Sequence, residues 1–283
     1  MPELPEVETV ARGLRRILPG TRLARAELRR TDMARIGAAD WPRLRNLEWG
    51  EIERAGKYLL FTLHGLAPHS RNRPAWRLMI HLGMSGQLRL SQATEALPPH
   101  THAIFHLEAG RQLRFQDPRR FGRLGLLPLA ADADIAEIDA RLGVAKGWEP
   151  LEIGEAQFVE LFRGGKTPIK SALLDQKRLR GVGNIYADES LHRAGIAPRA
   201  RTISRPRLLR LRREIRAVLR AAIRAGGSSV SDYVNSHGER GWFQIQHRVY
   251  GREGQPCGNC GAVIRRIEMA GRSAHYCPQC QRR

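Results

Sequence analysis

The chain begins with residues that could supply an amine nucleophile from the end of the backbone. The sequence opens Met1-Pro2-Glu3-Leu4-Pro5-Glu6, and removal of Met1 would leave Pro2 as a free secondary amine beside the Glu3 carboxylate. An α-amine has an unperturbed pKa of about 8, so part of it is neutral and nucleophilic near neutral pH. Pro2 and Pro5 also suit the first turn of a helix, where the missing N–H of proline costs little. The terminus alone therefore favours a helix start over catalysis.

A second chemical signature lies near the other end of the chain, where all four cysteines are found. They form two C-x2-C pairs separated by sixteen residues: Cys257, Cys260, Cys277 and Cys280. This spacing is typical of a zinc site in which each pair presents two thiolates from one tight turn. Four thiolates fill a tetrahedral shell, so we predict one structural Zn²⁺. A pair of disulfides is the alternative, but it is disfavoured in a chain that we expect to be intracellular.

The net charge predicts the class of partner. The 283 residues include 48 Lys and Arg against 28 Asp and Glu, which gives a formal net charge of +20. The isoelectric point near 11.2 indicates a polyanionic partner, with nucleic acid favoured over an acidic membrane surface. No apolar run is long enough to cross a bilayer, and no signal peptide precedes the acidic start. We therefore expect a soluble, intracellular protein with no membrane partner.

The first half of the chain combines one helix with many short strands. Residues 5–18 form the predicted helix, because Val7, Val10 and Leu14 recur on one face. The positive end of its dipole would disfavour protonation of the Pro2 amine and lower its pKa. Strand-like segments follow at 22–29, 51–63, 76–82, 86–90, 102–108, 112–116 and 123–127. Several short strands in succession predict an antiparallel sandwich or barrel.

The second half of the chain changes to helical periodicity. We predict helices over residues 155–163, 168–176, 184–194 and 205–225. The last helix is rich in arginine, and a solvated basic face is the favoured interpretation for most of these side chains. Gly226-Gly227 ends it.

Six segments of the chain occur in an order that indicates one enzyme family. They are Pro2–Glu6, Lys57–Leu60, His81–Gly86, Asp117–Gly122, Gly181–Ala187 and the four-cysteine segment. Together they closely resemble bacterial formamidopyrimidine-DNA glycosylase, and the resemblance runs through essentially the whole chain. It implies a base-excision-repair enzyme that removes oxidised purines such as 8-oxoguanine and formamidopyrimidines. It also implies an AP lyase that cleaves the strand by β,δ-elimination.

The resemblance also implies an α+β fold and its division into domains. An N-terminal helix plus an antiparallel β-sandwich lobe would occupy residues 1–132, followed by a linker at 133–147. An α-helical lobe with a helix–two-turns–helix element would span 148–236, and a C-terminal β-hairpin zinc finger 237–283. The expected partner is damaged double-stranded DNA, bound between the lobes. We expect a monomer with no small-molecule cofactor.

The resemblance gives four residues roles in the chemistry. Pro2 would attack C1′ of the damaged nucleotide and expel the base, forming an iminium ion that cannot lose its charge by shedding an N–H proton. That cation makes the C2′ proton removable, which allows strand cleavage. Glu3 would act as general acid and base. Lys57 would assist the lyase steps, and Arg272 would act in δ-elimination; from the residues alone, Lys57 is equally a solvated strand end and Arg272 a phosphate contact.

Other residues of the family pattern would contact DNA. Met84, Arg119 and Phe121 match an intercalating trio that fills the gap left by an extracted base, although Met84 and Phe121 could also be ordinary core residues. The expected phosphate ligands are His100, Lys166, Lys170 and Asn184, with His102 close enough to His100 to confuse the assignment. The chain departs from the pattern at Gly164-Gly165, before Lys166, and at Ser231, within the segment 226–240 that covers the extracted base in relatives. These departures could alter lesion preference.

Two other functions remain open from the sequence. An endonuclease VIII-like glycosylase for oxidised pyrimidines shares Pro2, Glu3, a lysine and the finger. Leu4 and the intercalating trio favour the purine enzyme. A non-catalytic zinc-finger DNA-binding protein would explain the charge and the cysteines, but it would not need the Pro2-Glu3 terminus.

Overall fold

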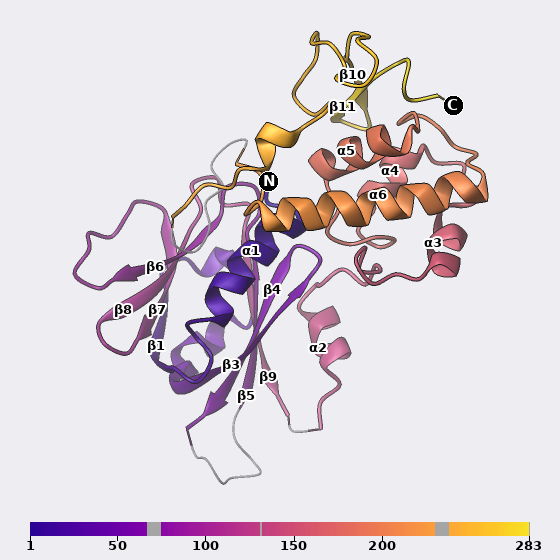
Figure 1. Ribbon diagram of the computed structural model, residues 1–283. Coiled ribbons are helices and arrows are strands. Elements are labelled where there is room, and N and C mark those ends of the chain that lie inside the picture. The colour runs from indigo at the N-terminus through magenta and orange to yellow at the C-terminus, as the bar shows by residue number, and fades with distance from the viewer. Residues whose placement is uncertain (67–74, 131, 230–237, 283) are drawn as a thin grey trace. The chain divides into compact units, whose positions relative to one another are not determined.

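The chain folds into two units, one dominated by a β-sheet and the other by α-helices. The computed structural model (Figure 1) describes residues 1–66, 75–130, 132–229 and 238–282. The first unit comprises residues 1–144 and 226–241, and the second comprises 145–225 and 242–283. Within the described residues, no helix combines the length and apolar character needed to cross a membrane.

The first unit is built from one helix and one large sheet. Helix α1 (Leu4–Arg15) is followed by short 3-10 turns η1 (Thr31–Met33) and η2 (Ala38–Arg43) between strands. The strands are β1 (Arg22–Leu28), β2 (Ala34–Ile36), β3 (Arg45–Ala55), β4 (Tyr58–Gly65), β5 (Ala75–His81), β6 (Gln87–Gln92), β7 (Thr101–Leu107), β8 (Arg111–Gln116) and β9 (Arg123–Leu129). In the described chain they form a 9-stranded sheet of order β2-β9-β5-β4-β3-β1-β7-β8-β6. All neighbours are antiparallel except β2 and β9.

One core joins the two halves of this sheet. Trp49 on β3 lies edge-on to Phe61 of β4 at 5.4 Å and to Phe105 of β7 at 5.6 Å between ring centroids. The apolar face of α1, including Val10 and Leu14, is buried in the same cluster. Because strands from both halves of the sheet bury side chains together, the sheet must fold over on itself. The prediction of a helix with an antiparallel sandwich lobe is confirmed.

The predicted strand 51–63 is wrong, because the structure divides it into two. β3 ends at Ala55 and β4 begins at Tyr58, and these two residues pair directly across the hairpin. The two-residue turn between them places Gly56 at φ 59°. A glycine with positive φ at the first position of such a turn matches strand twist. The turn leaves Lys57 at the head of β4.

The segment predicted as a linker contains a helix of the first unit. α2 (Ile135–Arg141) begins at Asp134, whose side chain accepts hydrogen bonds from the backbone N–H groups of residues 136 and 137. Ile138 is buried against the sheet in one cluster with Met79. Asp139 also pairs with the buried guanidinium of Arg77, at 2.9 and 3.0 Å. The alternation of acidic residues with Ala and Gly therefore encodes an amphipathic helix here.

The second unit is helical with a small hairpin. Its elements are α3 (Glu155–Phe162), α4 (Ile169–Leu174), α5 (Asn184–Ala194), α6 (Arg205–Arg224), η3 (Phe243–Gln246), β10 (Arg265–Met269) and β11 (Arg272–Tyr276). The apolar face of α6, which includes Leu211, Ile215 and Val218, is buried, and α6 packs on α3 and α5. The hairpin turns through Ala270 and Gly271, both at positive φ. The predicted helical lobe and β-hairpin finger are confirmed.

Candidate active site and metal centre

The N-terminal residues lead directly into α1. Pro2 and Glu3 are both buried, Glu3 with only 2% of its surface exposed, and the Glu3 N–H donates to Oε2 of Glu6 at 2.8 Å. The other oxygen of Glu6 accepts the N–H of Ser228 at 2.7 Å. Glu6 therefore has a structural task that ties the chain terminus to the segment 226–229.

The ends of the segment expected to cover the extracted base lie against each other. Gly241 donates its N–H to Oγ of Ser229 at 2.8 Å. A Cβ atom added to Gly241 would collide with the carbonyl oxygens of Gly226 and Gly227, so the two strands of backbone meet without side chains between them. Ser231, a departure from the family pattern, lies outside the described residues.

Lys57 lies close to an unusual histidine. Lys57 is 6% exposed. Burial, followed by the positive charges of Lys57 and Arg123, lowers the pKa of His81 to about 4. The His81 ring contacts Tyr58 at 4.8 Å between centroids, and its Nδ1 accepts the N–H of Gly83 at 3.1 Å. A neutral imidazole therefore stands beside the Lys57 ammonium at physiological pH.

The structure brings the three residues predicted to intercalate together on two neighbouring turns. Met84 follows β5 and is 39% exposed, and Phe121 follows β8 and is 51% exposed. The guanidinium carbon of Arg119 lies 5.0 Å from the centre of the Phe121 ring. Both apolar side chains therefore point out of the core, which excludes ordinary core packing as their role.

A buried carboxylate holds these two turns together. Asp117 is fully buried, and its Oδ1 accepts the hydroxyl of Ser85 at 2.6 Å while its Oδ2 accepts the N–H of Gly122 at 2.6 Å. The N–H of Arg119 lies 3.3 Å from Oδ1. The turns also touch through backbone, because a Cβ on Gly83 would overlap the backbone at Gly122. We call these contacts the Asp117 network.

The geometry separates the two histidines that the sequence could not distinguish. Nε2 of His102 donates to the carbonyl oxygen of Asp117 at 2.8 Å, and His102 is buried. His100 is exposed, adopts φ 62°, and contributes its carbonyl oxygen to the N–H of Asp117. The imidazole of His100 is thus the one available to an external ligand.

Lys170 is placed differently from the other predicted phosphate ligands. It is 1% exposed, its Nζ lies 2.6 Å from Oδ1 of Asp188, and it donates to the carbonyl oxygen of Ser273. A direct phosphate contact by Lys170 would require this ion pair to open, so the structure favours a bracing role. Lys166, by contrast, is exposed just after Gly164-Gly165.

Asn184 and the finger hairpin lie side by side within the second unit. Asn184 is the first residue of α5, and its Nδ2 donates to Oγ of Ser273 at 3.3 Å. Ser273 follows Arg272, which begins β11 and is exposed. The positive end of a helix and a guanidinium therefore occur in one region, an arrangement that suits a phosphate.

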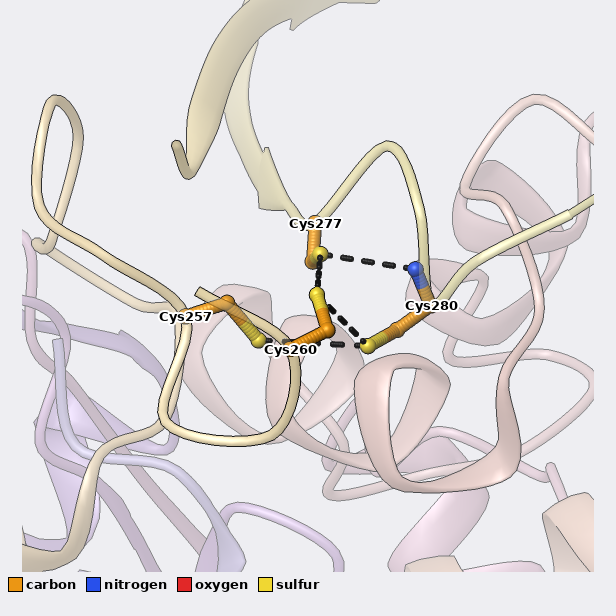
Figure 2. A group of neighbouring side chains, drawn as sticks. All are labelled: Cys257, Cys260, Cys277 and Cys280. Carbon is orange, nitrogen blue, oxygen red and sulfur yellow. Dashed lines mark hydrogen bonds between the residues drawn. The ribbon is translucent and has the colours of Figure 1, made fainter. Parts of the chain in front are cut away.

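The four cysteines are arranged as a zinc ligand set (Figure 2). Their sulfur atoms all lie within 4.8 Å of one another. Separations of 3.4 Å (Cys260–Cys277), 3.4 Å (Cys260–Cys280) and 3.9 Å (Cys257–Cys280) are close to the spacing of about 3.8 Å that Zn–S bonds of about 2.3 Å impose in a tetrahedron. The N–H of Cys280 also points at the sulfur of Cys277 at 3.4 Å. The residues fit Zn²⁺, which would cross-link the two C-x2-C turns.

Several positioning residues were missed by the sequence analysis. Ser85, Asp117 and Asp188 act through buried hydrogen bonds, and His81 acts through a partly buried one. Glu189 is another, since its fully buried carboxylate accepts the backbone N–H groups of residues 248, 249 and 250 at 2.9–3.0 Å. A polar residue inside or next to an apolar run was the one available signal, and it does not identify the partner.

Comparison with known proteins agrees with this geometry over the whole chain. The sequence model described as the Formamidopyrimidine-DNA glycosylase N-terminal domain matches residues 1–124. The corresponding H2TH domain matches 147–234, and the zinc finger found in FPG and IleRS matches 254–283.

Individual relatives cover the chain from end to end. Formamidopyrimidine-DNA glycosylases from Gluconobacter oxydans and Solibacter usitatus are 43% and 44% identical, with 100% of each chain covered. A Lactococcus lactis FPG variant bound to DNA containing Fapy-dG superposes with a TM-score of 0.88 at 34% identity, covering 100% of both chains. MutM in complex with DNA containing carbocyclic 8-oxo-G gives 0.87 at 32% identity, also with full coverage. The chain belongs to the formamidopyrimidine-DNA glycosylase family.

Proposed function

We propose that the protein excises oxidised purines from double-stranded DNA and then cleaves the resulting abasic site as an AP lyase. The observation that carries the proposal is the union, in one chain, of the Pro2-Glu3 terminus with an exposed intercalating trio. Full-length similarity to formamidopyrimidine-DNA glycosylases supports the same activity. A protein that only bound DNA would need neither feature.

The chemistry begins at the chain terminus once Met1 is removed. The lone pair of the Pro2 nitrogen attacks C1′ as the bond from C1′ to the base breaks, the base leaves with a proton, and the Pro2 nitrogen loses its own N–H proton. Glu3 donates a proton to O4′ as the bond from C1′ to O4′ breaks, which opens the sugar and leaves an iminium between Pro2 and C1′. The iminium withdraws electrons, so a proton leaves C2′ and the bond from C3′ to its oxygen breaks. Loss of the C4′ proton with cleavage of the bond from C5′ to its oxygen completes δ-elimination, and hydrolysis of the iminium frees Pro2.

Lys57 and Arg272 are proposed to assist the elimination steps. Lys57 stands beside His81, whose lowered pKa keeps the imidazole uncharged. The neutral ring adds no charge of its own, so the positive charge that attracts a phosphate next to the lesion comes from the Lys57 ammonium and from Arg123 nearby. Arg272 is exposed at the finger hairpin, where it can stabilise the departing 5′ phosphate.

In this proposal Met84, Arg119 and Phe121 contact the bases at the lesion, and a second set of residues binds phosphates. Phe121 would fill the step left by the extracted nucleotide, while Arg119 faces the unpaired partner base and Met84 packs into the gap. His100, Lys166 and Asn184 would hold phosphates. Lys170 contributes through its hold on Ser273, or directly if its ion pair with Asp188 opens.

Zinc has a structural part in this scheme. When bound by the four thiolates, Zn²⁺ holds the finger folded and leaves no open coordination position. The cysteines fix the turns on either side of β10 and β11, and so set the position of Arg272. No step of the reaction passes through the metal.

The proposal extends to the state of the protein in the cell. We infer a monomer that needs no small-molecule cofactor and works in the bacterial cytoplasm, where chromosomal DNA is found. We also propose functional segments at 1–132, 148–236 and 237–283, joined at 133–147. Light scattering of the purified protein, alone and with duplex DNA, would test the monomer; a stable dimer at micromolar concentration would contradict it.

Oxidised pyrimidines are the second candidate substrate class. A wild-type Lactococcus lactis FPG has been crystallised with DNA containing an oxidised pyrimidine, at 34% identity to this chain. Parallel assays on 8-oxoguanine and thymine-glycol duplexes would rank the two classes. Faster excision of thymine glycol would favour the endonuclease VIII-like alternative.

Borohydride trapping tests the central claim. Reduction of the iminium should join the protein covalently to damaged DNA, and intact mass should show that Met1 is absent. Pro2→Gly and Glu3→Gln should lose base excision while keeping most DNA affinity. A protein that retains Met1 and still cuts at full rate, or that never becomes trapped, would overturn the proposal.

A further inference from the structure

Helix α5 presents a polar stripe to the zinc finger. Asn184, Asp188 and His192 are spaced four residues apart, so they lie on one face of the helix. Each one contacts a different part of the finger: Ser273, His275 and Cys257 respectively. A helix that touches the metal site at one point and the hairpin at two others can connect them mechanically.

The contact nearest the metal is between His192 and Cys257. Nε2 of His192 lies 3.5 Å from the sulfur of Cys257, and His192 is 3% exposed. A zinc-bound thiolate carries no proton, so the ring nitrogen that faces it must be the donor. The other ring nitrogen, Nδ1, is buried and makes no hydrogen bond within the described residues. The sulfur is therefore the polar group toward which this imidazole is oriented.

The remaining contacts bind the hairpin to the same helix. Asp188 is fully buried, and its Oδ2 accepts the N–H of His275 at 2.9 Å. Its other oxygen pairs with Lys170, which also donates to the carbonyl oxygen of Ser273. Ser273 in turn accepts from Asn184. The eight residue steps from Asn184 to His192 span about 12 Å of helix, with finger contacts at both ends.

We propose that His192 is an outer-shell residue of the zinc site that stabilises the Cys257 thiolate and, through α5, couples zinc occupancy to the DNA-binding end at Asn184. The first half of this proposal concerns the metal alone. The second half rests on the proposed function, because it takes Asn184 as a phosphate ligand. Coupling between two binding sites is reciprocal, so DNA should retain zinc as much as zinc favours DNA.

The first experiment measures zinc release without DNA. Full-length zinc-loaded protein is mixed with a chromogenic chelator, and the release rate is followed by absorbance. His192→Phe fills the site without an N–H and should release zinc about tenfold faster, the lower end of the range for lost outer-shell partners. His192→Gln keeps an N–H donor and should recover much of the difference. Ser190→Ala is the matched control. Ser190 lies on the same helix, and its buried hydroxyl has no hydrogen-bond partner among the described residues.

The second experiment adds a duplex that carries a tetrahydrofuran abasic analogue, which Pro2 cannot attack. DNA should slow zinc release from the wild type, and the slowing should shrink in His192→Phe. Thermal melting identifies any variant that has lost its fold; His192→Asn, whose amide is too short to reach the sulfur, then replaces the phenylalanine.

Equal release rates, within twofold, for the wild type and a folded variant without the donor would overturn the outer-shell role. Equal slowing by DNA in both would overturn the coupling. Because neither readout depends on base excision, failure of this inference is distinguishable from failure of the proposed function, which the trapping assay tests separately.

Discussion

Replacement of Asp117 by Asn should slow extraction of the damaged base from the duplex without slowing the chemistry at Pro2. The fully buried carboxylate accepts hydrogen bonds from the Ser85 hydroxyl and from the Gly122 N–H, both at 2.6 Å. Asn can accept the Gly122 N–H through its carbonyl oxygen and donate its amide N–H to the Ser85 hydroxyl, which accepts as well as donates. Both bonds then lose their charge assistance, and a hydrogen bond to a charged group contributes about 1.5–3 kcal/mol against about 0.5–1.5 kcal/mol for a neutral one.

The loss of charge assistance in two bonds predicts that Asp117→Asn lowers the free energy of unfolding of its unit by about 2–3 kcal/mol. For a unit of this size each kcal/mol shifts Tm by about 2–4 °C, so a fall of about 4–12 °C is expected. The protein should still fold at 25 °C, because typical domains are stable by about 5–15 kcal/mol. Activity can therefore be compared in the native state.

The assay compares two substrates under single-turnover conditions. In the proposed mechanism, excision of 8-oxoguanine from a duplex needs Met84, Arg119 and Phe121 in register, and a displacement of about 1 Å can cost up to about 100-fold in rate. Cleavage of an abasic site in single-stranded DNA needs no base extraction, so its rate should change by less than about threefold, because Pro2 and Lys57 lie outside the Asp117 network.

Ser85→Ala is the milder companion, since it leaves the carboxylate and its bond to Gly122 intact. Ser91→Ala, a serine on β6 outside the network, is the control. If Asp117→Asn slowed both substrates equally, the network would be a general structural element. If it slowed neither, the trio would not depend on it.

Three further predictions follow from the same contacts. His81 has a folded-state pKa of about 4 against 6.5 for the ordinary group, so the unfolded chain binds more protons between these values. The free energy of unfolding should therefore fall by up to about 3 kcal/mol as pH drops from about 6.5 to 4. His81→Gln should flatten this pH dependence in urea titrations, and an unchanged slope would refute the assignment. Cys277→Ala should reduce zinc content and DNA affinity together, measured by metal analysis and fluorescence anisotropy; full affinity without zinc would contradict the structural role. DNA affinity should fall linearly with log salt, and Lys166→Ala should reduce the slope by about one; an unaltered slope would exclude a phosphate contact by Lys166.

The parts of the fold that could be predicted from sequence are those specified by local spacing. The apolar period of α6 and the two C-x2-C pairs each need only a few neighbouring residues to be recognised. The strands at 76–82 and 112–116 were also found to within one residue, because short apolar runs end at polar turns. Resemblance to the family supplied the roles of Lys57 and Arg272 and the candidate DNA contacts, which spacing alone would not have selected.

The errors arose where a distant partner decides the structure. Residues 51–63 read as one strand, since a single glycine does not reveal that Ala55 and Tyr58 pair across a turn. Lys170 was predicted as a phosphate ligand, and that stays a prediction, but nothing near it in sequence indicates the Asp188 carboxylate with which it pairs in the interior. The helix α2 was missed since its buried contacts come from the sheet rather than from its own composition.

The buried carboxylates share one physical role that explains why a chain of net charge +20 keeps them inside. Glu6, Asp117, Asp188 and Glu189 are each at most 2% exposed, and each accepts at least one backbone N–H group from a turn or segment distant in sequence or beside a strand end. For Asp117 and Asp188 that segment lies beside residues proposed to act on DNA. Turns of this kind have little apolar surface to bury, so hydrogen bonds to a buried charge must fix them. On the surface the same carboxylates would repel phosphate, whereas in the interior they accept hydrogen bonds from backbone amides. Buried Asp and Glu residues beside proposed DNA contacts should therefore be tested as positioning residues. Each is replaced by Asn or Gln, and thermal stability and the rate of base excision are measured separately.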